Sequence, residues 1–321
     1  MKRVLNITVI TLVMMILSAG CADKLNFIAP KVNENAVIVP TPAVIVSFDS
    51  GSVAVSSLSE SMHAVCEMNG NVYSAGGWDG VVRSSSVFSS ADGVNFTRIA
   101  DNSGFTPRTG HSMIPFNNAL WITGGYDGSF KNDVWYSADG ISWFEASGSA
   151  AFSPRQGMTL QNFKGNMWLI GGTNAGGEAG DIYWSLNGAA WVKASNAPEG
   201  TGIGHTSFVF HGKMYIVAVV QKNTKYDNPL WVSEDGIKWV QADKDLNFGF
   251  QHIAGAVVMN NKIYVLGDVC ANYPDAIAQK GDVYESEDGL KWKKMKIDNA
   301  GIKCGFHPVA FGDKLVLVGG Y

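Results

Sequence analysis

Residues 108–143 read RTGHSMIPFNNALWITGGYDGSFKNDVWYSADGISW. Short apolar or alternating runs in this stretch are separated by Asn117-Asn118 and by Asp139-Gly140. Both dipeptides tolerate the positive φ of tight hairpin turns, so each marks a reversal between antiparallel strands. The stretch therefore predicts four strands, at 112–116, 120–123, 133–137 and 142–146, with a glycine pair after the second.

The same pattern recurs along most of the chain. An Asp-Gly or Asn-Gly turn is followed three residues later by an aromatic side chain at Phe96, Trp143, Trp191, Trp239 and Trp292. The differences between successive numbers in this series are 47, 48, 48 and 53. Glycine pairs recur in step with it, at Gly76-Gly77, Gly124-Gly125, Gly171-Gly172 and Gly319-Gly320. Four antiparallel strands in a repeat of this length are typical of a β-propeller blade.

The copies give five complete blades and one that is divided between the chain ends. Only two strands, at 307–311 and 315–318, follow Trp292. Residues 43–48 and 52–57, joined by a turn at 49–51, can supply the third and fourth strands of this last blade. Pairing the two ends would remove exposed sheet edges. We expect an all-β, six-bladed β-propeller over residues 43–321, in which residues 43–57 pair with residues 305–321.

The repeat resembles that of the kelch β-propellers. The resemblance rests on Pro107-Arg108 with His111, the glycine pair, Asn132-Asp133-Val134-Trp135 and the trailing Trp143. It covers roughly residues 60–321 and implies a kelch-type fold, but it is almost uninformative about activity. The Ser-x-Asp-Gly turn also resembles the sialidase Asp-box, which implies a structural role for its Ser, Asp and Trp side chains.

The first residues predict export and a lipid anchor. Lys2 and Arg3 precede an apolar run at 4–17, a pattern typical of a secretory leader and short for a transmembrane helix. Residues 17–21, LSAGC, resemble a bacterial lipobox, which implies that residues 1–20 are removed and that Cys21 is lipidated. Residues 21–42 would be the lipidated cysteine and its tether. We expect a lipoprotein of the bacterial cell envelope, on the outer membrane if there are two. The alternative is an ordinary signal peptide.

The balance of charged residues limits the classes of partner that the chain could bind. The chain has 24 Lys and Arg against 28 Asp and Glu, so it lacks the basic excess of a nucleic-acid binder. We expect membrane contact only through the lipid anchor.

Cys270 and Cys304 lie in loops that should emerge on one face of the propeller, and export favours a disulfide between them. Cys66 is interpreted as a buried small side chain.

Loops after the second strands and loops between blades should share one face, and we predict that ligands bind there. Arg108 and Arg155 suit carboxylate pairing, and aromatic side chains suit stacking. Histidines recur near the starts of the innermost strands, where structural hydrogen bonding is the alternative to ligand contact. The ligand-face candidates are Trp78, Asp79, Arg108, His111, Tyr126, Asp127, Arg155, Glu178, His205 and His252, with Tyr226 in an equivalent loop.

No metal site or cofactor is predicted. The loop Asp243-x-Asp245-x-Asn247-x-Gly249 has oxygen ligands at calcium-like spacing, but its glycine comes one place late and Ala254 stands where a bidentate Glu should be. Galactose-oxidase-like kelch enzymes bind copper through Tyr and His, often adjacent, and this chain contains no Tyr-His dipeptide.

Three hypotheses for the function follow. The first is an envelope-anchored binding or scaffolding module for a protein or glycan, because no paired catalytic carboxylates or triad motif are evident. The second is a carbohydrate enzyme resembling the bacterial sialic-acid mutarotase or epimerase, in which Arg108 or Arg155 would clamp a carboxylate and a His or Glu178 would move protons. The third is a purely structural envelope protein without a small ligand.

Overall fold

The structure is a computed structural model that describes residues 45–48, 51–56, 58, 60–267, 282–295 and 305–320. Every regular element within these ranges is a strand, and they contain no helix able to cross a membrane. The predictions for the leader, for lipidated Cys21, for the tether and for the Cys270–Cys304 disulfide lie outside the described residues.

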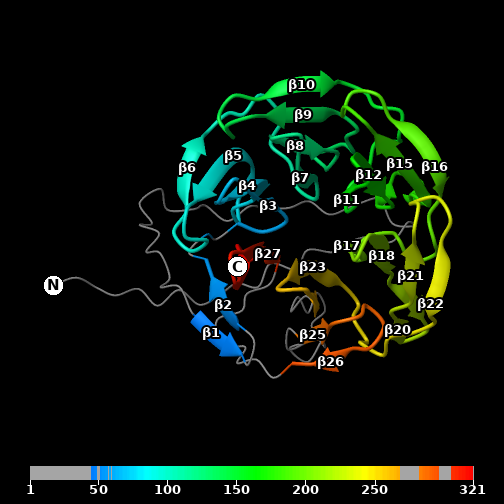
Figure 1. Cartoon of the computed structure of the whole chain (residues 1–321). Coiled ribbons are helices and arrows are strands. Elements are labelled where there is room, and N and C mark those ends of the chain that lie inside the picture. Colours follow the sequence, from blue (N-terminus) through cyan, green and yellow to red (C-terminus); the bar gives the residue numbers. More distant parts are fainter. Residues whose placement is uncertain are drawn as a thin grey trace.

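The fold is an all-β propeller, as the repeat predicted. Figure 1 shows the four-stranded sheets arranged around a common centre, with β3, β7, β11, β17, β23 and β27 nearest to it. Five of these sheets each come from one continuous stretch of chain, and their strands pair antiparallel in chain order from the inside outward. We number them as the first to fifth blades.

The first two blades hold β3 (Ala64–Met68), β4 (Asn71–Trp78), β5 (Arg83–Ser90) and β6 (Thr97–Ala100), then β7 (Ser112–Phe116), β8 (Ala119–Thr123), β9 (Val134–Ser137) and β10 (Phe144–Ser147). The third holds β11 (Thr159–Phe163), β12 (Asn166–Ile170), β15 (Asp181–Ser185) and β16 (Val192–Asn196). The fourth holds β17 (Thr206–Phe210), β18 (Lys213–Val217), β21 (Leu230–Ser233) and β22 (Val240–Asp243). The fifth holds β23 (Ile253–Met259), β24 (Lys262–Gly267), β25 (Val283–Ser286) and β26 (Lys293–Lys294).

Two of the loops after second strands contain small hairpins of their own. The hairpin of the third blade is formed by β13 (Thr173–Asn174) and β14 (Gly177–Glu178). That of the fourth blade is formed by β19 (Val220–Lys222) and β20 (Lys225–Asp227). Both hairpins extend the loop end of their blade.

A further four-stranded sheet, which we call the terminal sheet, combines strands from both ends of the chain. Its order is β1 (Ile45–Phe48), β2 (Gly51–Val55), β28 (Lys314–Val318) and β27 (His307–Phe311). Five blades of continuous chain are therefore present, fewer than the six predicted. The terminal strands do share one sheet, but a sixth blade that closes the ring stays a prediction.

The N-terminal strands also take a different order from the one the sequence suggested. We expected residues 43–48 as the third strand, next to the C-terminal pair. Instead β2 lies beside β28 and pairs with it in parallel, and β1 lies outside. The reason is burial: Ala54 of β2 is 1% exposed and packs in one cluster with Val316 and Val318 of β28.

The hydrophobic core is distributed over the seams between neighbouring sheets. One cluster, for example, joins Ala75 and Val87 of the first blade to Leu120 and Ile122 of the second. Trp143 belongs to that cluster, and its indole Nε1 donates to the Gly140 carbonyl at 3.0 Å.

The Ser-x-Asp-Gly turns have the structural role predicted for them. The Asp139 carboxylate accepts hydrogen bonds from the backbone N–H groups of Ile141 and Ser142, both at 2.8 Å. Ser137 Oγ accepts one from Gly140 N at 2.8 Å, and Gly140 has a φ of +77°. These turns lie at the end of the blades opposite to the glycine pairs and hold the outer two strands together.

Candidate functional site

The two kinds of loop predicted to share a face do lie together. Residues just before a first strand bridge residues just after a second strand at Ser61–Trp78, Thr109–Tyr126 and Gln156–Thr173. The glycine pairs lie at the same end of the blades. We call this end of the propeller the glycine-pair face.

The structure places the side chains of Arg108 and Arg155, two of the ligand-face candidates, in buried ion pairs. Both side chains are 0% exposed. Arg108 pairs bidentately with Asp133, at 2.6 and 2.7 Å, and donates to the Gly124 carbonyl at 3.0 Å. Arg155 pairs with Asp181 at 2.5 Å. Each guanidinium therefore ties the start of its blade to the third strand of that blade.

The ion pair with Arg108 also fixes the charge of Asp133. Burial alone would raise the pKa of Asp133, but the hydrogen bonds and the charge of Arg108 outweigh it and hold that pKa below its ordinary value. Asp133 is therefore an anion committed to the scaffold, and it also accepts the indole N–H of Trp135 at 2.8 Å.

The histidine candidates lie in the seams between blades. His111 is 5% exposed, and its Nε2 lies 2.9 Å from the Ala75 carbonyl of the preceding blade. A Cβ added to Gly76 would lie 2.5 Å from His111 Cε1, so the glycine makes room for this ring. His63 is placed in the same way against Gly319 of the terminal sheet. His252 is half-buried, and its ring would be 3.1 Å from a Cβ at Gly204.

Burial also lowers the pKa values of His63, His111 and His205. It lowers the pKa of His111 to about 3, assisted by the charge of Arg108, and lowers that of His205 to about 4. The pKa of His63 also lies well below its ordinary value because the ring is buried. The structure thus places His111 and His205, two of the ligand-face candidates, as buried rings. The Nδ1 of His205 lies 2.7 Å from the Gly202 carbonyl and its Nε2 lies 3.3 Å from Thr159 Oγ1.

The aromatic candidates remain on the glycine-pair face. Trp78 and Tyr126 are both half-buried. The Tyr126 ring lies between the Arg83 guanidinium, 5.1 Å from its centroid, and the Phe130 ring, 5.3 Å away. Arg83 is paired with Trp78 in the register of β4 and β5. These four residues form a joint surface of the first and second blades, which we call the aromatic surface.

The acidic candidates shape the loops. Asp79 is exposed and accepts hydrogen bonds from Val81 N and Val82 N, both at 2.8 Å. Asp127 binds Lys131 Nζ and Thr106 Oγ1, each at 2.8 Å, and these contacts hold its pKa below the ordinary value despite burial. Glu178 is exposed on its hairpin and accepts from Thr201 Oγ1 at 3.4 Å.

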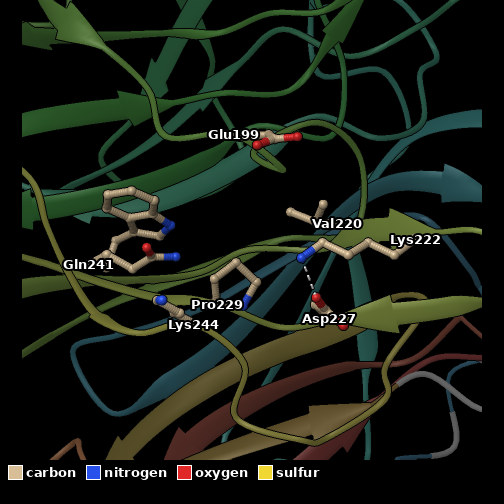
Figure 2. A pocket seen from close by; sticks show the side chains of 8 residues that line it. Glu199, Val220, Lys222, Asp227, Pro229, Gln241 and Lys244 are labelled. Carbon is tan, nitrogen blue, oxygen red and sulfur yellow. Dashed lines mark ion pairs between the residues drawn. The ribbon is translucent and has the colours of Figure 1, made fainter.

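A cavity lies on the outer part of the same face, at the fourth blade (Figure 2). Its volume is about 80 Å³. It is lined by Glu199, Val220, Lys222, Asp227, Pro229, Trp231, Gln241 and Lys244. Tyr226 is the candidate that the sequence pattern indicates in this loop, and the pattern did not predict the cavity. The available signal was a difference between copies: Pro229 stands where the second blade has Asp133.

A metal site is not evident in the described ranges, where no group of three or more His, Cys, Asp or Glu side chains could hold an ion. In the calcium-like loop, Asp245 Oδ1 accepts from Asn228 N and Asn247 N, both at 2.9 Å. Asp243 Oδ1 accepts from Asp245 N at 3.1 Å. These carboxylates cap the loop.

No protein-family profile matches the sequence, and no curated protein matches it either.

Proposed function

We propose that this chain is a lipoprotein of the bacterial envelope whose kelch-type propeller binds a protein or glycan through the glycine-pair face. The contrast between the two ends of the blades carries this proposal. At the opposite end, capped turns such as 137–140 leave little room for recognition. The glycine-pair face instead carries longer loops, two added hairpins, the aromatic surface and the cavity. Loops on a rigid scaffold are where binding residues concentrate.

We further propose that the terminal sheet is the sixth blade and closes the ring. Innermost strands contact one another in the order β3, β7, β11, β17, β23 and β27, and β27 contacts β3 again. Gly77 N donates to the Arg108 carbonyl of the next blade at 2.9 Å, and Gly125 N to that of Arg155 at 2.8 Å. Gly320 N makes the matching bond to the Glu60 carbonyl at 2.7 Å. This repetition supports treating the seam at the chain ends like the others.

The binding hypothesis is favoured over the carbohydrate enzyme by how the ionisable groups are used. The enzyme hypothesis needs an accessible arginine for a carboxylate, and a histidine or Glu178 to move protons. Arg108 and Arg155 are instead buried in ion pairs, and His111 and His205 are held neutral by burial. A sugar-anomer exchange assay is the direct check, and we expect no acceleration by the full chain.

The binding proposal is tested by probing glycan and peptide arrays with the full chain and its variants. We expect Trp78→Ala and Tyr126→Ala to weaken the selected interaction about tenfold or more, since each removes an aromatic contact. Ile141→Ser and Ile237→Ser are matched controls, because these side chains are 54% and 48% exposed on the opposite turns. If only the control variants lost binding, recognition would lie on the opposite turns, and the proposal would be contradicted.

Anchoring is tested separately. We expect Cys21→Ala to release the protein from the membrane fraction or to leave it unprocessed. Normal processing with unchanged fractionation would end the lipoprotein proposal.

A further inference from the structure

The indole N–H of Trp231, in the wall of the fourth-blade cavity, lacks the partner that its counterpart has. In the second blade, Trp135 Nε1 donates at 2.8 Å to Asp133, two residues earlier. Pro229 holds the place two residues before Trp231, and its side chain offers no acceptor. Trp231 Nε1 is shielded from solvent and has no hydrogen-bond partner among the described residues. A buried donor left in this way is unfavourable and marks a place where an acceptor can be gained.

The fourth blade has also lost the side chain that fills this region elsewhere. Phe105 and Phe152 stand three residues before Arg108 and Arg155, are 2% and 0% exposed, and pack in the seams with the preceding blades. In the fourth blade the carbonyl that accepts from the glycine pair belongs to Thr201, which accepts from Gly172 N at 2.8 Å, so Thr201 stands at the arginine position and Pro198 stands three residues earlier. Phenylalanine, arginine and aspartate are thus replaced together in one copy. The cavity lies beside Pro229, the residue that replaces the aspartate.

The charges around the cavity are arranged unevenly. Lys222 and Asp227 neutralise each other at 2.6 Å. The other two charged side chains of the lining, Lys244 and Glu199, make no ion pair among the described residues. Figure 2 shows Glu199 on one side of the cavity and Lys244 with Gln241 on the other. Hydrogen-bond donors therefore gather near Trp231 and Lys244, and an acceptor faces them from Glu199.

We propose that this cavity binds a small amino or hydroxy carboxylic acid. Its carboxylate would accept from the Trp231 indole N–H and pair with Lys244, and its amino or hydroxyl group would donate to Glu199. The exposed side chains of Gln241 and Lys244 turn aside to admit it. Val220 and Pro229 supply the apolar wall. This inference names a ligand class for the glycine-pair face, and its biological role rests on the proposed binding function.

The test follows the indole N–H resonances of the full chain by NMR in a buffer without carboxylates. The Trp231 resonance is identified by its loss in Trp231→Phe. We expect a saturable downfield shift with glycine or with lactate, the stronger of the two identifying the second group, and a weaker response to acetate. The Trp135 resonance is the internal control and stays in place, because its N–H already has a carboxylate acceptor.

Two variants make the test specific. Glu199→Phe puts a bulky side chain without a carboxylate into the lining, so it should abolish the shift while the other indole resonances stay unchanged. Lys244→Ala should weaken binding about tenfold, the effect of losing one charged contact. The inference is overturned if no carboxylic acid moves the Trp231 resonance, if glucose moves it equally, or if the shift survives in Glu199→Phe.

Failure here is distinguishable from failure of the proposed function. Array binding that depends on Trp78 and Tyr126 would stand without any response at Trp231. A specific response at Trp231 would in turn stand if the aromatic surface proved silent.

Discussion

Arg108 and Arg155 illustrate how a single residue type is assigned a role by its surroundings. Both precede their histidine or methionine by three residues in sequence and could equally face a ligand or the scaffold. The deciding partner of Arg108 is Asp133, 25 residues away. That distance is why the sequence allowed both interpretations. Pairing became apparent only when the second blade was folded.

Arg155→Ala should destabilise the protein by about 3–5 kcal/mol, because removal of one partner leaves the Asp181 carboxylate without its buried counterion. The matched control is Arg98→Ala. Arg98 forms an exposed ion pair with Asp101, with side chains 57% and 72% exposed, so we expect a change of about 0.5 kcal/mol or less. Urea unfolding of both variants measures the difference. Equal, small effects would contradict a scaffold role for Arg155.

Glu60 occupies the position of Arg108 and Arg155 in the first blade. It is 5% exposed, and its Oε2 has no hydrogen-bond partner among the described residues. Burial raises the pKa of Glu60 to about 8, although the Arg98 charge opposes this. A carboxyl group whose folded pKa exceeds its unfolded value of 4.5 holds its proton in the folded state. Its contribution to stability is therefore complete below pH 4.5 and is lost as the pH rises through 8.

Glu60→Gln should remove this pH dependence, because the amide resembles the protonated acid. As the pH rises from 5 to 9, we expect the unfolding free energy of the variant to increase relative to that of the wild type by a few kcal/mol, since one pKa unit corresponds to about 1.4 kcal/mol. Unfolding free energies of both proteins across this range give the difference. The buried histidines are the same in both proteins, so their contribution to the pH dependence cancels in the comparison. A pH-independent difference would show that Glu60 ionises normally in the folded state.

Elements whose signals are local were well predicted. The hairpin turns and the Ser-x-Asp-Gly turns are fixed by neighbouring residues, and they formed where the repeat indicated. The parallel pairing of β2 with β28 was not predicted, because it depends on burial of Ala54 against strands more than 250 residues later. The cavity was missed for a related reason. Its lining includes Pro229, which stands where the second blade has Asp133, and this difference becomes informative only when the copies are compared position by position.

The glycine pairs allow each blade to approach the next. A Cβ on Gly124, at φ +67°, would lie 2.1 Å from Met158 Cε and 2.9 Å from the Arg155 carbonyl oxygen. Gly124→Ala should therefore destabilise the protein by about 2–3 kcal/mol through strain and overpacking together. Gly165→Ala is the control, because Gly165 has a similar φ of +75° with nothing within 4 Å. In thermal unfolding, Gly124→Ala should have a clearly lower Tm than Gly165→Ala. Equal decreases in Tm would contradict a role for close packing at the seam.

At the scale of the whole molecule, the proposed closure of the ring depends on strands from both ends of the chain. Deletion of residues 43–57 should expose the edge of β28 and cause aggregation or loss of cooperative unfolding. Deletion of residues 22–42 is the control and should leave unfolding unchanged, because it spares the terminal strands. A soluble protein of full stability after the first deletion would show that the propeller does not need its N-terminal strands.

The most direct measurement is amide hydrogen exchange of the full chain with and without the ligand selected on the arrays. If the glycine-pair face is the binding surface, protection should appear in loops after second strands, at 78–82, 126–130 and 219–227. The turns at 137–141 and 233–237, at the opposite end of the blades, should exchange at the same rate in both states. Protection confined to those turns, with the three loops unchanged, would contradict the account.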